Sequence, residues 1–277
     1  MKISQGVRFM LIATFTFSMM KVCVKVLSHI PPIEIILFRS IISLVICVIL
    51  LRRQGVSVWG TNKKVLILRG TVGAIALVTY FGLLQQIPLA TAATLLYMAP
   101  IFTAILGIFL VKEKVAPVQW LFFLVSFIGV VVITGFDTRI SFFHLLLGVS
   151  STVFSGLAYN FIRILKTSEH PLVIIFYFPL VTLPIAGTWS SQVWVQPVGW
   201  DWLFLILVGL FTQVAQFFMT KSYQTEELSK VSIINYTGII YVLGFGWVFF
   251  GEHFNLMTYL GMGLVLVGVI SNVLFKR

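Results

Sequence analysis

Two lysines lie in a stretch of sequence that is otherwise apolar. In "FSMMKVCVKVL", residues 17–27, Lys21 and Lys25 are one helical turn apart. A charged side chain near the middle of a bilayer costs about 2.5–3.5 kcal/mol on insertion scales, and such side chains usually face the interior of a helix bundle. Thr14 and Ser18 continue the same helix face at steps of three or four residues. This polar stripe predicts a helix face that lines a path for a polar solute.

Further polar side chains recur at helical spacing inside other apolar segments. The candidate substrate-binding residues are Thr14, Ser18, Lys21, Arg39, Tyr97, Tyr159, Gln213, Gln216, Asn235 and Tyr236. Each has a structural alternative, because buried hydroxyls often bond only to neighbouring helices and buried tyrosines often only pack. Lys25 either faces the path or reaches the outer interface along its flexible stem. Arg69, near the cytoplasmic end of its segment, is interpreted as an anchor to lipid headgroups.

The chain shows no motif for enzymatic chemistry. It has no HExxH, DxD, CxxC or P-loop sequence, and catalysis on a lipid-linked substrate needs a nucleophile, paired carboxylates or a metal site. Cys23 and Cys47 lie inside apolar segments and indicate neither a disulfide nor a metal site. We therefore expect no enzyme activity, no metal and no cofactor, and an integral-membrane enzyme is much less favoured than a carrier.

Composition indicates a polytopic membrane protein. Of the 277 residues, 59% are apolar and 10% are charged, compared with about 45–50% and 25% in soluble domains. The net charge of +11 comes from basic residues scattered singly between apolar runs, a pattern that argues against a nucleic-acid partner. The expected partners are the lipid bilayer and a small-molecule substrate.

Ten stretches are long and apolar enough to cross a bilayer as helices of about 20 residues. They are residues 6–27, 32–51, 65–86, 90–111, 117–135, 144–164, 171–190, 202–222, 228–250 and 256–275. Lys and Arg gather in the loops at 52–64 and 111–114, whereas the loop at 187–201 has none. By the positive-inside rule, both termini are predicted to be cytoplasmic. The expected fold class is an all-α integral membrane protein with ten transmembrane helices.

The chain aligns with itself when it is shifted by 139 residues. Matched pairs include Gln85 with Gln224, Tyr97 with Tyr236, Glu113 with Glu252, and Gly129 with Gly268. Residues 1–139 and 140–277 are therefore predicted to form two repeats of five helices each. Because five is odd, the second repeat enters the membrane upside down, which places a site near the midplane between the halves and supports alternating access.

Two matched segments carry a family resemblance. They are "RGTVGAIALVTYFGLLQQIPLATAATLLYMAPIFTAILGIFLVKEK", residues 69–114, and "LSKVSIINYTGIIYVLGFGWVFFGEHF", residues 228–254. The R-G start, the P-L-A-x-A segment, the APIFTAILG run and the Glu that closes each half resemble the EamA-like drug/metabolite transporter superfamily. The resemblance covers essentially the whole chain. It implies ten helices, both termini inside, and a central cavity lined mainly by helices 1–4 and 6–9.

These observations predict a secondary transporter in the inner membrane of a bacterium. We expect it to move a small polar metabolite by alternating access, and a basic path favours an anionic or zwitterionic, amino-acid- or nucleotide-like solute. The alternative is a flippase or carrier for a lipid-linked phosphate, which the lysines also suit. Glu113 and Glu252 are interpreted as caps of the next helix. Glu34 is interpreted as a partner of Lys25. The sequence does not decide whether the protein forms a homodimer.

Overall fold

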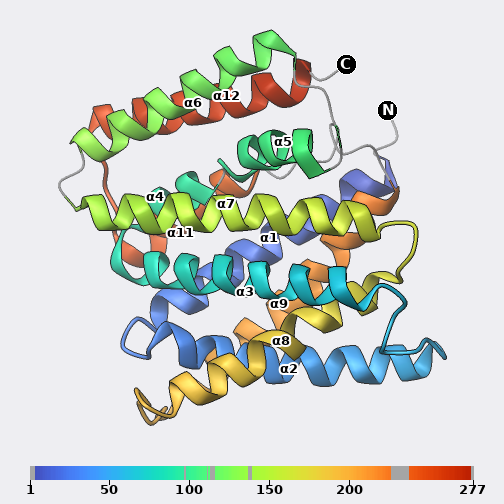
Figure 1. Cartoon of the computed structure of the whole chain (residues 1–277). Helices are drawn as coiled ribbons and strands as arrows, with labels where there is room; N and C mark the ends of the chain where they lie inside the picture. The colour runs from blue at the N-terminus through green and yellow to red at the C-terminus, as the bar shows by residue number, and fades with distance from the viewer. Residues whose placement is uncertain are drawn as a thin grey trace.

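The computed structural model describes residues 4–96, 98–110, 112, 116–136, 139–225 and 237–275, and these residues form an all-helical bundle. Its helices are α1 (Gln5–Val26), α2 (Pro32–Arg53), α3 (Lys63–Gln86), α4 (Leu89–Leu96), α5 (Ala99–Leu110), α6 (Pro117–Phe136), α7 (Phe142–Leu165), α8 (Pro171–Ser190), α9 (Asp201–Thr225), α11 (Thr237–Phe250) and α12 (Leu256–Phe275). Helix α1 begins and α12 ends at the same end of the bundle (Figure 1). We call this the terminal end and the opposite one, where α1 and α3 end, the distal end.

Seven helices of the described chain are long and apolar enough to cross a membrane by length and composition, when α4 and α5 are taken together as Leu89–Leu110. Shorter apolar helices lie at Trp120–Ile133, Ile240–Phe250 and Leu256–Gly268. Each stretch expected from the sequence coincides with one of these helices, although 228–236 lies outside the described residues.

Residues with known preferences mark the ends of several helices. Pro32 and Pro171 open α2 and α8 at the position where the missing N–H of proline leaves no hydrogen bond unmade. Ser141 and His144 form a capping box at the start of α7, in which each side chain accepts a hydrogen bond from the backbone N–H of the other. Gly251 ends α11 with a φ of +58°, which glycine adopts without steric strain.

The helix pairs of the first half recur in the second. Helix α1 packs on α9 as α3 packs on α7, and α5 packs on α7 as α11 packs on α1. Two further pairs join corresponding helices, α2 with α8 and α6 with α12. Figure 1 shows these two pairs on opposite sides of the bundle. The described helices therefore pack with an approximate internal twofold relationship.

The contact between α6 and α12 joins positions 139 residues apart. Ser126 Oγ donates a hydrogen bond to the Val265 carbonyl oxygen at 3.3 Å. A Cβ on Gly129 would lie 2.7 Å from Val265 N, and a Cβ on Gly268 would lie 2.8 Å from Ser126 N. The same contact is thus made twice with the roles of the two helices exchanged, and the glycines let the backbones approach closely.

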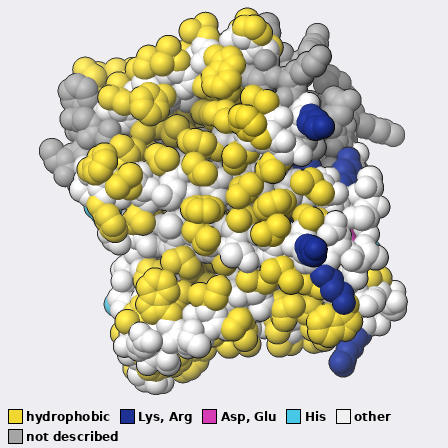
Figure 2. Space-filling view, viewed as in Figure 1, with side chains coloured by type: hydrophobic (Ala, Val, Ile, Leu, Met, Phe, Trp, Pro, Cys, Tyr) yellow, Lys and Arg dark blue, Asp and Glu magenta, His cyan; other side chains and the backbone are white. Residues whose placement is uncertain are grey.

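Apolar side chains cover the outside of the bundle as well as its core. Phe109 is 75% exposed, Ile240 70% and Trp247 64%. Figure 2 shows hydrophobic side chains across the visible face, with Lys and Arg gathered along the edge that corresponds to the terminal end in Figure 1. An apolar surface of this extent indicates contact with lipid.

Candidate substrate-binding site

Two buried arginines from α2 and α3 lie against one phenylalanine of α8. The guanidinium carbon of Arg39 is 4.8 Å from the ring centroid of Phe178, and that of Arg69 is 5.0 Å from it. Arg39 is 4% exposed and Arg69 is 5% exposed. An aromatic face attracts a guanidinium at this range, by about 0.5–2 kcal/mol. The ring thus stabilises both cations inside the bundle but supplies no negative charge.

The two arginines differ in their hydrogen bonds. Arg39 Nε donates to Thr212 Oγ1 at 3.1 Å. In contrast, Nε and Nη1 of Arg69 are buried and have no hydrogen-bond partner within the described part of the chain. Neither arginine forms an ion pair with a carboxylate there. Because a buried donor without a partner costs about 1–3 kcal/mol, and a charged one more, these nitrogens mark a place where a ligand can complete the site.

The charges around Arg69 favour an anionic ligand. Arg39 and Arg69 are close enough to repel each other electrostatically, and Arg69 also interacts with the hydroxyl of Tyr159, a partly buried residue of α7. Charges interact strongly in a region from which water is excluded. An anion bound near both guanidiniums would replace their repulsion with attraction.

Glycines on α3 allow α8 to come close to Arg69. A Cβ on Gly70 would lie 2.9 Å from the Tyr177 carbonyl oxygen, and a Cβ on Gly73 would lie 2.8 Å from Cδ2 of Phe178. A side chain at position 70 would push the two helices apart, and one at position 73 would displace the ring of Phe178. The R-G pair at 69–70 therefore has a physical reason, since the glycine brings the α8 backbone against α3 and places Phe178 beside Arg69.

Lys21 of α1 forms a second buried cationic position. It is 7% exposed, and its Nζ lies 6.0 Å from the ring centroid of Tyr80 on α3. Tyr80 and Arg69 lie eleven residues apart on the buried face of the same helix, which corresponds to about 16 Å along the helix axis. The two cationic positions are therefore spaced along one inner face of α3.

The hydroxyl groups of the α1 stripe are used inside the protein. Ser18 Oγ donates to the Thr14 carbonyl oxygen at 2.8 Å, and Thr14 Oγ1 donates to the Leu11 carbonyl oxygen at 3.0 Å. Thr14 Oγ1 also lies 3.4 Å from Thr237 Oγ1 of α11. Their geometry matches the structural alternative for this stripe, in which hydroxyls bond to their own helix or a neighbouring one.

The two glutamines of α9 have different surroundings. Gln213 Oε1 accepts a hydrogen bond from Ser43 Oγ at 2.6 Å, and its Nε2 donates to Cys47 Sγ at 3.2 Å. Gln213 therefore ties α9 to α2. Gln216 Oε1 is buried without a hydrogen-bond partner in the described ranges. Of the two glutamine side chains, Gln216 therefore has the oxygen that can still accept a hydrogen bond.

The described structure brings together only some of the candidates from the sequence. Arg39 and Tyr159 both lie near Arg69, whereas Lys21 lies at Tyr80, farther along α3. Three further candidates lie outside the described residues, namely Tyr97, Asn235 and Tyr236.

The interpretation of Arg69 as a headgroup anchor is wrong. Helix α3 begins at Lys63, which places Arg69 about 9 Å from its start, and the side chain turns into the bundle. Phe178 and Thr212 were not expected at the site either. The sequence contained one indication that Phe178 and Arg39 occupy equivalent positions, because each lies seven residues after the proline that opens its helix.

The expected pairing of Lys25 with Glu34 is also wrong. Lys25 Nζ donates to the Ile87 carbonyl oxygen in the connection between α3 and α4. Glu34 Oε2 instead accepts a hydrogen bond from the Val195 N–H at 3.0 Å. The loop between α8 and α9 folds back over the start of α2, so its backbone, and not Lys25, bonds to Glu34.

Glu252 caps a helix, but not the one that follows it. Its Oε1 accepts from the Leu89 N–H at 2.6 Å and its Oε2 from the Ala90 N–H at 3.4 Å, both at the start of α4. A carboxylate is favourable there because the first N–H groups of a helix lack partners within the helix. The capping role is thus confirmed on a helix of the other half, whereas Glu113 lies outside the described residues.

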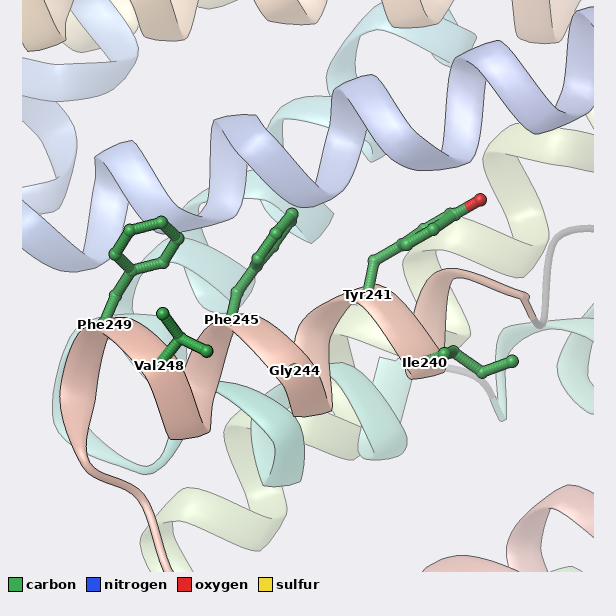
Figure 3. A pocket seen from close by; sticks show the side chains of 6 residues that line it. All are labelled: Ile240, Tyr241, Gly244, Phe245, Val248 and Phe249. Atoms are coloured by element: carbon green, nitrogen blue, oxygen red, sulfur yellow. The ribbon is translucent and has the colours of Figure 1, made fainter.

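A shallow apolar groove runs along the outside of α11. It has a volume of about 300 Å³ and is lined by Ile240, Tyr241, Gly244, Phe245, Val248 and Phe249. Figure 3 shows the rings of Tyr241, Phe245 and Phe249 on the side of α11 that faces α1, and Phe15 of α1 packs edge-on against Tyr241 at 5.4 Å. Its lining contains no charged side chain, so it suits a lipid chain rather than a polar solute.

The apolar helices and the enclosed cations define a multi-pass membrane protein. The chain belongs to the EamA-like transporter family, which it matches over residues 4–135 and again over 142–274. This confirms the resemblance carried by the two matched segments.

Known relatives of the chain are transporters. It is 32% identical to the pseudopaline exporter CntI of Pseudomonas aeruginosa (strain UCBPP-PA14), with 97% of this chain and 96% of that protein aligned. It is 28% identical to solute carrier family 35 member G1 of Homo sapiens, with 97% and 78% aligned. A protein solved by crystallography shares the fold at 17% identity, with a TM-score of 0.71 over 98% of this chain and 96% of that one.

Proposed function

We propose that the protein is a secondary transporter that moves a small anionic or zwitterionic metabolite across the inner membrane of a bacterium by alternating access. The observation that carries this proposal is the pair of buried arginines at Phe178, which lacks a carboxylate partner in the described chain. Buried cations of this kind line substrate pathways in membrane proteins. The transporter relatives support transport, and the site supports an anionic group on the solute.

Alternating access needs two halves that move against each other. The matching helix pairs and the contacts between positions 139 residues apart support two inverted repeats, residues 1–139 and 140–277. The gathering of Lys and Arg at the terminal end supports a cytoplasmic location for that end. On this view the arginines at Phe178 lie between the halves, because α2 and α3 belong to one repeat and α8 to the other.

The distal end carries contacts that such a movement would break. Lys25 holds the connection between α3 and α4 through the Ile87 carbonyl oxygen, and Glu252 holds the start of α4. Glu252 crosses from one half to the other. We interpret this arrangement as a state closed at the distal end. An anion at the arginine pair would then change the balance between closed and open states by binding one of them more tightly.

Transport is tested with purified protein reconstituted into lipid vesicles. Uptake and counterflow of labelled amino acids, nucleotides and organic anions are measured beside labelled cations, and we expect flux for at least one anionic or zwitterionic solute. Arg39→Gln should lower this flux at least tenfold, since about 1.4 kcal/mol of lost binding corresponds to a factor of ten. Arg53→Gln is the matched control, because Arg53 is an exposed arginine of the same helix.

Flux of cations alone, or of no solute in the panel, would contradict the proposal. The lipid-linked phosphate carrier is separated in the same vesicles by measuring how fast a fluorescent lipid-linked phosphate crosses the bilayer. Fast crossing of that lipid without flux of any soluble anion would replace the metabolite carrier with a flippase.

A further inference from the structure

Arg69 is a buried arginine whose bonding capacity is unused in the described structure. A guanidinium carries five N–H donors, and two nitrogens of Arg69, Nε and Nη1, are buried without a partner among the described residues. Its neighbours Phe178 and Arg39 offer no side-chain acceptor, and the third neighbour, Tyr159, offers only a neutral hydroxyl. Lipid headgroups cannot supply one either, because the residue is 5% exposed. Within the described part of the chain, the unused donors of Arg69 therefore favour a partner that enters the bundle.

The chemistry of that partner follows from the donors. Arginine binds carboxylate and phosphate groups with several N–H bonds in one plane, and such charge-assisted bonds are about twice as strong as neutral ones. Arg39 uses its Nε to bond Thr212, so it can contribute its charge and the N–H groups of its two Nη atoms. Arg69 offers the buried N–H groups of its Nε and Nη1, and a cation would be repelled by both residues.

We infer that an oxyanion of the transported solute, a carboxylate or a phosphate, binds directly to Arg69, with Arg39 as a second cation and Phe178 as the residue that positions both guanidiniums. This inference rests on the proposed function and names the group that the site recognises. The ring of Phe178 lies within 5.0 Å of both guanidinium carbons. Gly73 has no side chain and therefore leaves room for the ring in this position.

Binding is tested without transport, on the protein purified in detergent. Glutamate, succinate, inorganic phosphate and AMP are titrated to 20 mM, with choline and glucose as cationic and neutral probes and with ionic strength held constant by NaCl. We expect at least one oxyanion to raise the melting temperature, because a ligand of the folded state stabilises it by mass action. Arg69→Gln should abolish this shift and Arg53→Gln should keep it.

Arg69→Lys separates recognition from charge. It retains the cation but not the planar set of donors, so we expect the Kd of the oxyanion probe to rise about tenfold or more. Arg69→Ala with added methylguanidinium provides a second readout, since the free cation should restore part of the shift. Absence of any oxyanion-induced shift in the natural chain, or an unchanged Kd in Arg69→Gln, would overturn the inference.

Phe178 has its own pair of variants. Phe178→Leu removes the aromatic face and should raise the Kd about tenfold, whereas Phe178→Tyr keeps the face and should leave the Kd within about twofold. Equal Kd values for the two variants would overturn the positioning role.

The outcomes also separate this inference from the proposed function. If the natural chain transports an anion and Arg69→Gln does so with the same KM, the inference fails and the transporter stands. If an oxyanion binds in a manner that depends on Arg69 but no flux occurs, the site stands and the transporter fails.

Discussion

The aromatic ring that contacts Arg39 and Arg69 depends on a glycine. Gly73 leaves room for Phe178, whose Cδ2 would lie 2.8 Å from a Cβ at that position. A Cβ at position 73 would also lie 3.4 Å from Nη1 of Arg69, so a substitution there would act on the site mainly through the ring and partly through direct contact with this arginine.

Gly73→Ala should therefore weaken transport. The added methyl group displaces the ring from both guanidiniums, and we expect the KM for the transported anion to rise about threefold to tenfold. The measurement is vesicle uptake as a function of solute concentration. Gly82→Ala on the same helix is the matched control, because a Cβ there meets nothing within 4 Å. Equal effects of the two variants would argue against the role of Phe178.

Glu169 is a second residue whose environment allows a prediction. It precedes α8 and accepts hydrogen bonds from the Thr61 N–H, the Thr61 hydroxyl and the Asn62 N–H, at 2.7, 2.7 and 2.6 Å. Burial alone would raise the pKa of Glu169, but these three donors outweigh burial and hold the pKa below its ordinary value of 4.5. The carboxylate thereby ties the loop between α2 and α3 to the start of α8.

The stability of the protein should depend on the charge of Glu169. Because the folded-state pKa is the lower one, its contribution is present above about pH 4.5 and is lost as the pH falls through the folded value. We expect Glu169→Gln to lower the melting temperature at pH 7 by roughly 4–8 °C and to reduce the loss of stability as the pH falls below about 4.5. Identical melting curves for both proteins at every pH would contradict the assignment.

At the scale of elements, α6 and α12 form a close contact in which glycines face the backbone of the other helix. A Cβ on Gly268 would lie 2.8 Å from Ser126 N, and backbone atoms of a helix cannot yield as a flexible side chain can. By contrast, a Cβ on Gly263 of the same helix meets nothing within 4 Å. The chain therefore offers a matched pair of glycines on one helix.

Gly268→Ala should force α12 away from α6, whereas Gly263→Ala should be neutral or slightly stabilising because alanine favours a helix over glycine by about 1 kcal/mol. We expect the first variant to lower the free energy of unfolding by about 1–3 kcal/mol, as overpacked contacts do. Melting temperature in detergent and the yield of monodisperse protein measure the difference. A stabilised Gly268→Ala would show that the helices are packed differently.

The positions of most helices were predictable from the sequence, whereas the residues that meet at the site were less predictable. The length of the apolar stretches was enough to locate the helices, because a membrane-spanning segment of this kind has few alternatives to a helix. The internal alignment at a shift of 139 residues also relates Arg39 to Phe178. The burial of Arg69 depends on the approach of α8 to Gly70, which no local pattern encodes. The bond between Glu252 and Leu89 joins residues 163 positions apart, so the sequence around either residue could not reveal it.

At the scale of the whole molecule, hydrogen bonds join the two halves at both ends of the bundle. The loop before α3 meets α8 through Glu169 and through the Tyr177 hydroxyl, which donates to the Trp59 carbonyl oxygen at 2.7 Å. At the distal end Glu252 meets α4, and Lys25 is close enough to Glu252 to interact electrostatically. A transport cycle that opens the ends in turn would have to release one set of contacts at a time.

Glu252→Gln should shift the protein toward a state open at the distal end. The amide binds the start of α4 more weakly than the carboxylate does, because it lacks the charge that the helix N-terminus favours. Spin labels at Ser28 and Leu256, in a background with Cys23 and Cys47 replaced by Ala, report the distance across this end. We expect a longer or broader distance distribution than in the labelled parent.

His253→Gln is the control for that experiment, since His253 is an exposed neighbour of Glu252. An unchanged distribution in Glu252→Gln would mean that the α4 cap does not hold the distal end closed.

The contact between Arg39 and Phe178 has one more consequence. The two residues occupy equivalent positions of α2 and α8, seven residues after the opening proline, and they meet each other. If the halves were identical copies, the same side chain would stand at both positions, and arginine would face arginine or phenylalanine would face phenylalanine. A cation can meet an aromatic face here because the two halves have different side chains at this position. The divergence of the two halves thus gives an asymmetric pair of side chains within a nearly symmetric arrangement of helices.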